Sequence, residues 1–244
     1  MFGLVEWREK GTPGGAREVR VHGVRFLAVS VVRGEGLRAA WSLRRAAGIL
    51  RRNGVTQAVF PREFPEYTAF AARGIVPVDV CPLREAMAAG IVRCAMAQAG
   101  LAPEKAVVAL CAARVTRAYA AAAEELARRI RYVRLCTAHG GWELADKLRR
   151  TLGAAAPVER SAEGADVLLC FDDSAEGATA RGICLPLRDR SLRVEYAVRA
   201  DEKCGGEPEQ LLAARYASLV LRAEDITVTG VSLRKAAAQS LTGS

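Results

Sequence analysis

The chain alternates strand-like apolar runs with segments of helical periodicity, and this alternation constrains the fold more than any other feature. Val24 to Val32 and Lys105 to Cys111 are rich in β-branched and apolar residues, as buried strands are. Segments long enough for several helical turns follow both runs. Strands that alternate with helices predict parallel βαβ units, so the expected fold class is α/β.

We expect two Rossmann-like lobes with parallel sheets, plus an N-terminal β-hairpin. The 244 residues suffice for two domains, and the Gly- and Pro-containing stretch 100–104 is the natural boundary. The first lobe is expected over 24–103 and the second over 104–244, with a frayed tail helix near 233–240. Residues 1–23 are expected to form a hairpin packed on the first lobe, because a dense turn signal at 11–15 separates two strand-like runs.

The chain is basic, with a net charge of +9 and a pI of about 9.5. Much of this charge is arginine, and one predicted helix, Gly36 to Asn53, carries five arginines opposite its apolar arc. They are Arg38, Arg44, Arg45, Arg51 and Arg52. A solvated helix face explains them, and Trp41 among them is expected to pack on a neighbouring element. Nucleic acid is therefore the least favoured partner.

A glycine-rich turn, Gly34-Glu35-Gly36-Leu37-Arg38-Ala39, matches the pattern G-x-G-x-x-[GA] between a predicted strand and a predicted helix. Such glycines let the backbone approach a pyrophosphate, and the helix N-terminus attracts its charge. Gly34 and Gly36 are therefore candidate cofactor-binding residues. A strand-to-helix turn without a ligand explains the same residues.

The run from Lys105 to Phe171 resembles, in the spacing of its elements, the nucleotide domain of shikimate-dehydrogenase-like oxidoreductases. The resemblance implies a Rossmann dinucleotide site, with NADP as its cofactor. At the first turn, however, Cys111, Ala113 and Thr116 stand where the fingerprint glycines are expected, and their side chains crowd the place of the pyrophosphate. The second strand of this lobe also does not end in an aspartate or glutamate, the residue that would bind a ribose hydroxyl. We therefore predict that this lobe does not bind NAD in the ordinary way.

Other candidate ligand-binding residues lie where strands of the second lobe end. His139-Gly140-Gly141 precedes a helix, so free amides there could bind an anion, and Thr137 and Cys111 lie at the same edge. Asp172 and Asp173 follow a buried strand, at the edge where open α/β sheets bind ligands. The carboxylates of Asp172 and Asp173 could hold a metal or accept a proton. Without a ligand, the turn at the start of a helix explains His139-Gly140-Gly141 equally well, and a loop explains the two aspartates.

Cys111, Cys136 and Cys170 each end a predicted strand, and in a Rossmann strand order these strands are neighbours. A soft-metal or redox site is one interpretation, and three small buried apolar residues is the favoured one. The seven cysteines contain no C-x-x-C pair and the chain has two histidines, so no metal site is assigned.

No hydrolase elbow, Walker loop or H-E-x-x-H motif is present, and the sequence assigns no catalytic residue. We favour a non-catalytic protein that senses a small molecule or binds a protein partner through a degenerate nucleotide domain. The alternatives are an NADP-type oxidoreductase with an atypical site, and a nucleic-acid-binding module that uses the arginine-rich helix. No apolar run spans a membrane and no secretory signal is recognised at the N-terminus, so a cytoplasmic location is expected.

Overall fold

The computed structural model describes residues 1–8, 15–34, 36–61, 64, 67–173, 182–199 and 209–233. The chain forms two compact units, which are described separately below. The first comprises Met1–Leu83 and Gly206–Ala223, and the second comprises Arg84–Gly205 and Glu224–Ser244. The units thus divide at Leu83/Arg84, about twenty residues before the expected boundary, and a later segment returns to the first unit. The expected α/β class with parallel sheets is confirmed.

The first unit is built on a five-stranded sheet in the order β2-β3-β1-β4-β5. The strands are β1 (Phe2–Arg8), β2 (Arg17–Val21), β3 (Val24–Val32), β4 (Gln57–Val59) and β5 (Val76–Pro77). β2 alone is antiparallel to its neighbour, β3. An N-terminal hairpin is present, but it joins β2 to β3 through His22 and Gly23. The expected pairing of β2 with β1 is wrong, because β3 lies between them and pairs with β1 along its whole length.

Three helices belong to this unit: α1 (Leu37–Arg52), α2 (Tyr67–Ala71) and α7 (Glu209–Ala217). α1 packs on β3 through the predicted apolar arc, of which Leu43, Ala47 and Leu50 are buried. Ala40 lies at the margin of this arc at 100° per residue, and it is exposed. A group of aromatic rings completes this core, formed by Phe60, Phe64, Tyr67 and Phe70.

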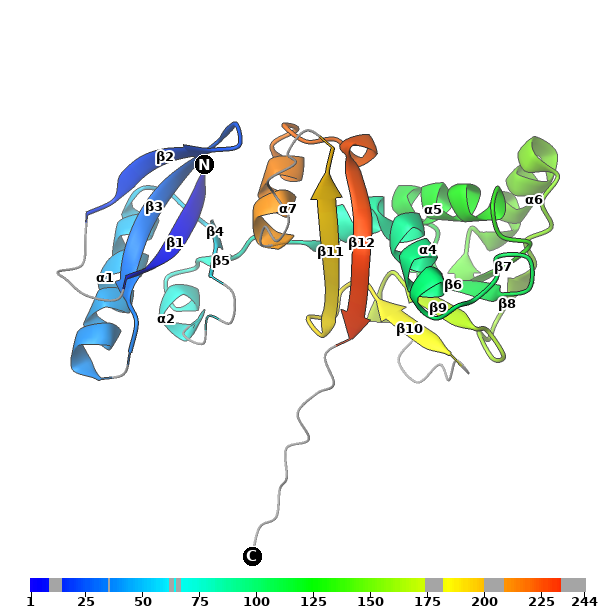
Figure 1. Ribbon diagram of the computed structural model, residues 1–244, viewed down its shortest axis with the longest axis horizontal. Coiled ribbons are helices and arrows are strands. Elements are labelled where there is room, and N and C mark those ends of the chain that lie inside the picture. The colour runs from blue at the N-terminus through cyan, green and yellow to red at the C-terminus, as the bar shows by residue number, and fades with distance from the viewer. Residues whose placement is uncertain are drawn as a thin grey trace, which may run out of the picture. The chain divides into compact units, whose positions relative to one another are not determined.

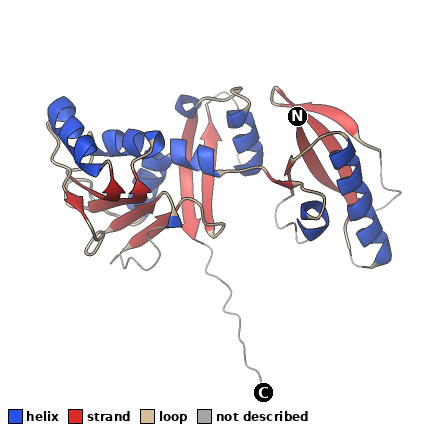
Figure 2. Cartoon of the chain, turned by 180° about the vertical axis from the view of Figure 1, so that it is seen from behind, coloured by secondary structure: helices blue, strands red, loops and turns tan. Residues whose placement is uncertain are grey.

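The second unit contains a fully parallel sheet in the order β10-β9-β6-β7-β8. Its strands are β6 (Val107–Arg114), β7 (Tyr132–His139), β8 (Val158–Glu159), β9 (Val167–Cys170) and β10 (Ile183–Pro186). Counted from β6, this is the order 3-2-1-4-5 of a Rossmann fold, read from the other edge. α5 (Arg117–Ala127) and α6 (Gly141–Leu152) cover one face of the sheet (Figures 1 and 2).

A second, antiparallel sheet completes this unit. β11 (Leu192–Val198) pairs with β12 (Ile226–Leu233), which follows the short helix η2 (Ala223–Asp225). α3 (Cys81–Ala86) leads into α4 (Ala88–Gln98), and α4 packs against β12. Of the tail helix expected near 233–240, Leu233 belongs to β12 instead, and the other residues lie outside those that the structure describes. Among the described residues, no helix has the length and apolarity needed to cross a membrane.

Candidate functional site

The carboxyl edge of the second unit's parallel sheet collects most of the candidate residues. β6, β7 and β9 end there side by side, and their strand order is the one that places ligands at this edge in open α/β folds. Thr137 and His139 lie among the last residues of β7, Cys111 lies on β6 before its last residues 112–114, and Asp172 and Asp173 follow β9 after Phe171. The structure therefore brings these candidates to one edge.

At the turn from β6 to α5, the chain's own groups accept from the backbone N–H groups of Ala113, Val115 and Tyr119. The N–H of Ala113 donates to Asp172 Oδ2 at 2.8 Å, and the N–H of Val115 donates to the carbonyl of His139 at 3.0 Å. Thr116 is the N-cap of α5 and accepts from the N–H of Tyr119 at 3.2 Å. A Rossmann pyrophosphate binds N–H groups at this turn. Here the N–H groups of Ala113 and Val115 have acceptors already, and one acceptor is a carboxylate that repels an anion.

β6 extends further than its sequence pattern indicates, and this extension forms the turn. β6 and β7 remain in register up to the pair Arg114 and His139. Tyr119, buried in α5, donates its hydroxyl to the carbonyl of Leu110 at 2.9 Å and fixes the helix to β6. Burial raises the pKa of Tyr119, so this hydroxyl keeps its proton.

The turn from β7 to α6 is shaped by two glycines. Gly140 is the N-cap of α6 in the left-handed conformation, with φ 81°, and no side chain caps the helix. Gly141 is packed so closely that a Cβ there would lie 2.8 Å from Thr137 Cγ2 and 2.9 Å from Val158 Cγ1. The Thr137 hydroxyl donates to the carbonyl of His139 at 3.2 Å. Gly141 and Thr137 thus have packing roles, while the His139 side chain is exposed.

Two exposed residues at this edge were not identified as candidates from the sequence. Trp142, in the first turn of α6, is 73% exposed, and Arg114 is exposed beside His139. The cation of Arg114 next to an uncapped helix N-terminus is a group that an anionic ligand could contact, and the ring of Trp142 adds apolar surface beside it. The sequence signal was available in Trp142, a tryptophan directly after the glycine pair.

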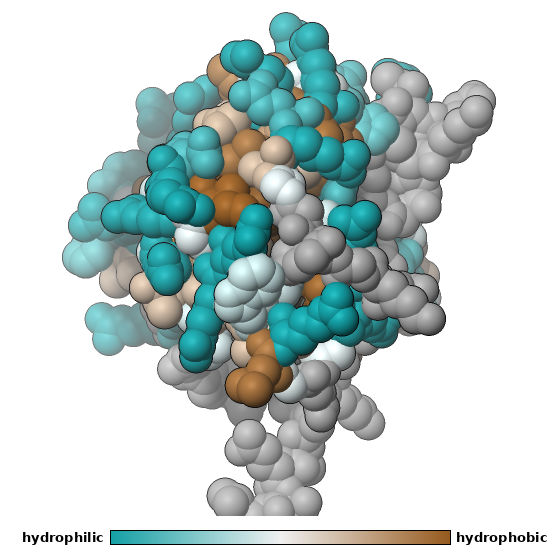
Figure 3. Space-filling view, turned by 90° about the vertical axis from the view of Figure 1, so that its left-hand side faces the viewer, coloured by the Kyte–Doolittle hydropathy of each residue, from teal (hydrophilic) through white to brown (hydrophobic). Residues whose placement is uncertain are grey.

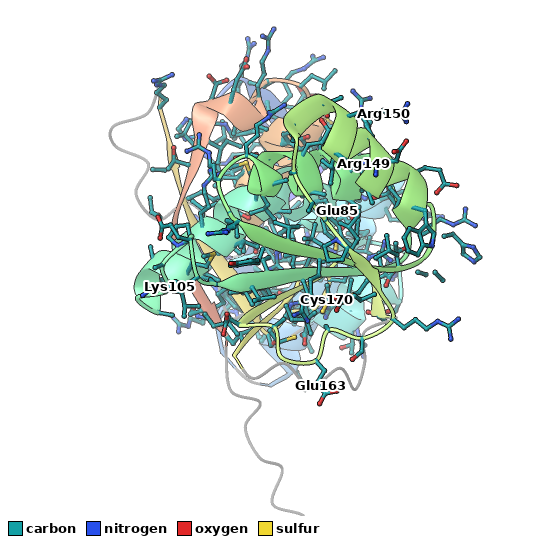
Figure 4. All side chains as sticks on the ribbon, turned by 90° about the vertical axis from the view of Figure 1, so that its right-hand side faces the viewer. Glu85, Lys105, Arg149, Arg150, Glu163 and Cys170 are labelled. Atoms are coloured by element: carbon teal, nitrogen blue, oxygen red, sulfur yellow. The ribbon has the colours of Figure 1, made fainter. Side chains whose placement is uncertain are left out.

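The four thiols of the second sheet lie on neighbouring strands and form what we call the thiol row: Cys184, Cys170, Cys111 and Cys136. Cys111 is in register with both Cys136 and Cys170, so the predicted neighbourhood of these three is confirmed. The sulfurs of Cys170 and Cys184 are 4.0 Å apart. The three buried thiols belong to one core cluster with Ala162 and Ala165, Cys184 packs against this cluster, and Figure 4 labels Cys170 among them. Sequence analysis missed Cys184, because nothing local places β10 beside β9.

Hydrogen bonding between the thiols separates their pKa values. A hydrogen bond from Cys170 lowers the pKa of Cys184 from 9.0 to about 7, while the same contact and burial raise the pKa of Cys170. Cys111 and Cys136 form a similar pair, in which the pKa of Cys111 is raised. Among the described residues, no group of three or more His, Cys, Asp or Glu side chains has the arrangement of a metal site.

The glycine turn expected to bind a phosphate belongs to the first unit. Gly34 and Gly36 have φ values of 135° and 98°, and Gly36 is the N-cap of α1 without a side-chain hydrogen bond. Glu35 lies outside the described residues. A cavity of about 690 Å³ in the same unit lies at the amino ends of β1 and β3, lined in part by Phe2, Val24 and Arg25. It is therefore at the opposite strand ends from the turn.

No family model matches the chain, and no curated protein matches it. Among solved structures, it is similar to a shikimate 5-dehydrogenase-like protein, with 10% sequence identity and a TM-score of 0.26. The similarity covers 71% of this chain and 66% of that chain, slightly less than two thirds of its length.

Proposed function

We propose that this protein is a non-catalytic ligand- or partner-binding protein whose second unit keeps the Rossmann layout and has lost the dinucleotide site. The observation that carries the proposal is the hydrogen bond from the Ala113 N–H to Asp172. It places a carboxylate at the turn where a dinucleotide pyrophosphate needs free N–H groups. Thr116 and His139 supply acceptors to two further N–H groups of the same region.

Ligand binding in this proposal uses the neighbouring turn from β7 to α6. Its exposed groups include His139, Arg114 and Trp142, and the N-terminus of α6 has no side-chain cap. These groups favour a small anion over an uncharged ligand. A reducing, cytoplasmic environment belongs to the same proposal, because all six described cysteines are free thiols.

The test is calorimetric titration of the full chain with NAD, NADP and NADPH, beside a thermal-shift screen of small anions and nucleotides. We expect no saturable dinucleotide binding in the micromolar range, and a raised melting temperature with a smaller anion. Micromolar binding of a dinucleotide that disappears in Ala113→Arg overturns the proposal.

An NADP-type oxidoreductase is the second candidate, and one observation favours it. Arg114 and His139 are register partners at the strand ends, and Rossmann proteins that select NADP place a cation near the ribose 2′-phosphate. This candidate requires binding of NADP in clear preference to NAD, with loss of the preference in Arg114→Ala. The same titrations therefore separate the two functions.

A further inference from the structure

The exposed side of α1, in the first unit, is unusually basic. The helix has no acidic residue, and its buried side packs into the core through Ala39, Leu43, Ala46, Ala47 and Leu50. All five arginines on the other side are exposed, as predicted. Hydrophilic side chains gather on the side of the molecule that Figure 3 presents, which belongs to this unit. Exposed arginines alone are explained by contact with solvent. The arrangement of the side chains therefore has to show whether this side of α1 is a binding surface.

An apolar strip runs along the middle of this basic side. At 100° per residue, Leu37 and Trp41 lie between a row that contains Arg44 and Arg51 and a row that contains Arg38, Arg45 and Arg52. Leu37 is 91% exposed and Trp41 is 51% exposed. Trp41 was expected to pack on a neighbouring element, but about half of its surface is exposed to solvent. The guanidinium of Arg45 lies 5.2 Å from the centre of its ring.

A sixth arginine extends the patch beyond the helix. Arg73 follows α2, and its side chain reaches the middle of the exposed side of α1. The Nη1 atom of Arg73 would lie 3.5 Å from a Cβ built on Gly48. Arg51 reaches back toward the turn at Gly74, with its Nη1 3.8 Å from a Cβ built there. Glycine at position 48 leaves the room that Arg73 uses. We call the surface of these arginines and Trp41 the basic face.

Few of these charges are neutralised within the described residues, where no ion pair is formed by Arg44, Arg45, Arg51 or Arg52. Four like charges on three turns of helix repel one another, and a polyanion would relieve this repulsion. We propose that the basic face binds single-stranded nucleic acid, with phosphates along the arginine rows and a base stacked on Trp41.

The chemistry of the face favours a nucleic acid strand over an anionic membrane. Guanidinium groups contact phosphates in pairs of hydrogen bonds, and an exposed aromatic ring stacks on any base. A helix that lies in a membrane inserts a broad apolar face. The apolar face of α1 is already buried in the core, and the large apolar residues that the helix exposes are Leu37 and Trp41. This inference is independent of any ligand at the second sheet.

The test measures fluorescence anisotropy of a labelled mixed-sequence 16-nucleotide RNA with the full chain at about 50 and 150 mM salt. The test variant is Arg44→Glu with Arg51→Glu. The matched control is Arg128→Glu with Arg129→Glu, two exposed arginines of the second unit, which changes the net charge equally. Trp41→Ala and Trp41→Phe form a second pair, since phenylalanine keeps a stacking surface. Melting curves establish that each variant is folded.

We expect the test variant to weaken binding at least tenfold and the control less than threefold. Trp41→Ala should weaken it about tenfold, and Trp41→Phe should restore most of that loss. Affinity should fall with salt by about 0.7 log units per log unit for each phosphate contacted. Equal losses in the test variant and the control, or no binding at the lower salt, overturn the proposal. So does competition by vesicles of anionic phospholipid that removes the RNA completely, which would assign the face to a membrane.

Discussion

The carboxylate of Asp172 accepts a hydrogen bond of 2.8 Å from the backbone N–H of Ala113, across the ends of β9 and β6. One residue earlier, the N–H of Phe171 donates to the carbonyl of Cys111, which is the last backbone bond between these strands. The Asp172 side chain thus continues the pairing where the backbone ladder stops. The same bond places the negative charge of Asp172 at the end of β6. One side chain thus both stabilises the strand ends and disfavours an anionic ligand there.

Replacing Asp172 should therefore destabilise the second unit without creating a dinucleotide site. Asp172→Ala is expected to lower the free energy of unfolding by about 1–2 kcal/mol, because a charge-assisted hydrogen bond is lost at a half-exposed position. Urea unfolding measures this change. Asp173→Ala is the control, since Asp173 is exposed and should change the stability by less than about 0.5 kcal/mol. Equal effects of the two substitutions would show that the bond adds nothing specific.

Local sequence patterns predicted those parts of the fold that local physics determines. A helix was expected after His139-Gly140-Gly141, and α6 runs from Gly141 to Leu152, because glycines mark its start and its apolar residues repeat with helical spacing. Pairing between distant segments was not visible. The turn signal at 11–15 identified two flanking strands, but nothing in it shows that β3 comes to lie between them.

The candidate site shows the same limit. Its residues were predicted because strand ends of a parallel sheet meet at one edge, which follows from topology alone. The acceptors of the Ala113 and Val115 N–H groups were not predicted, since both come from other strands. The pairing of Cys170 with Cys184 was missed for the same reason, as it depends on β10 joining the edge of the sheet.

Gly141 should tolerate no side chain. In Gly141→Ala, the new Cβ would meet Thr137 Cγ2 at 2.8 Å and Val158 Cγ1 at 2.9 Å, so α6 must move away from β7 and β8. We expect a loss of about 1–3 kcal/mol in thermal or urea unfolding, despite the higher helix propensity of alanine. Gly15→Ala is the matched control, because a Cβ there meets nothing within 4 Å. An unchanged melting temperature for Gly141→Ala would contradict the tight packing of this turn.

Arg84 should be among the most sensitive charged residues of the second unit. Its guanidinium is buried, with 4% exposure, and donates to the carbonyls of Leu187, Asp189 and Leu192 at 3.1, 2.8 and 2.7 Å. Arg84→Leu leaves the buried carbonyls of Leu187 and Leu192 and the part-buried carbonyl of Asp189 without their donor, and should cost about 3 kcal/mol in urea unfolding.

The comparison for Arg84 is Arg93→Leu. Arg93 forms an ion pair with Glu125 at a partly exposed position of α4, where such pairs contribute about 1 kcal/mol or less. A loss for Arg84→Leu no larger than for Arg93→Leu would mean that water or backbone groups replace the guanidinium at the three carbonyls.

The thiol of Cys184 should react with alkylating reagents at lower pH than the thiols of Cys94 and Cys170, whose pKa values are raised. The reactive species is the thiolate, and the hydrogen bond from Cys170 lowers the pKa of Cys184 to about 7, although burial and the charge of Asp189 oppose the shift. Cys184 is also partly exposed, whereas Cys170 is buried. Labelling with iodoacetamide, followed by mass spectrometry, should therefore give a rate at Cys184 that rises with pH, has its midpoint at about pH 7 and levels off roughly one pH unit higher.

The partner thiol provides the decisive variant. In Cys170→Ala the donor is removed, so the pKa of Cys184 should return toward its ordinary value of 9.0 and labelling at neutral pH should slow by on the order of tenfold. Cys94 is the internal reference, because burial and the nearby charge of Glu195 raise its pKa and make it slow throughout. A midpoint for Cys184 that does not move in Cys170→Ala would show that the 4.0 Å contact between the sulfurs does not stabilise the thiolate.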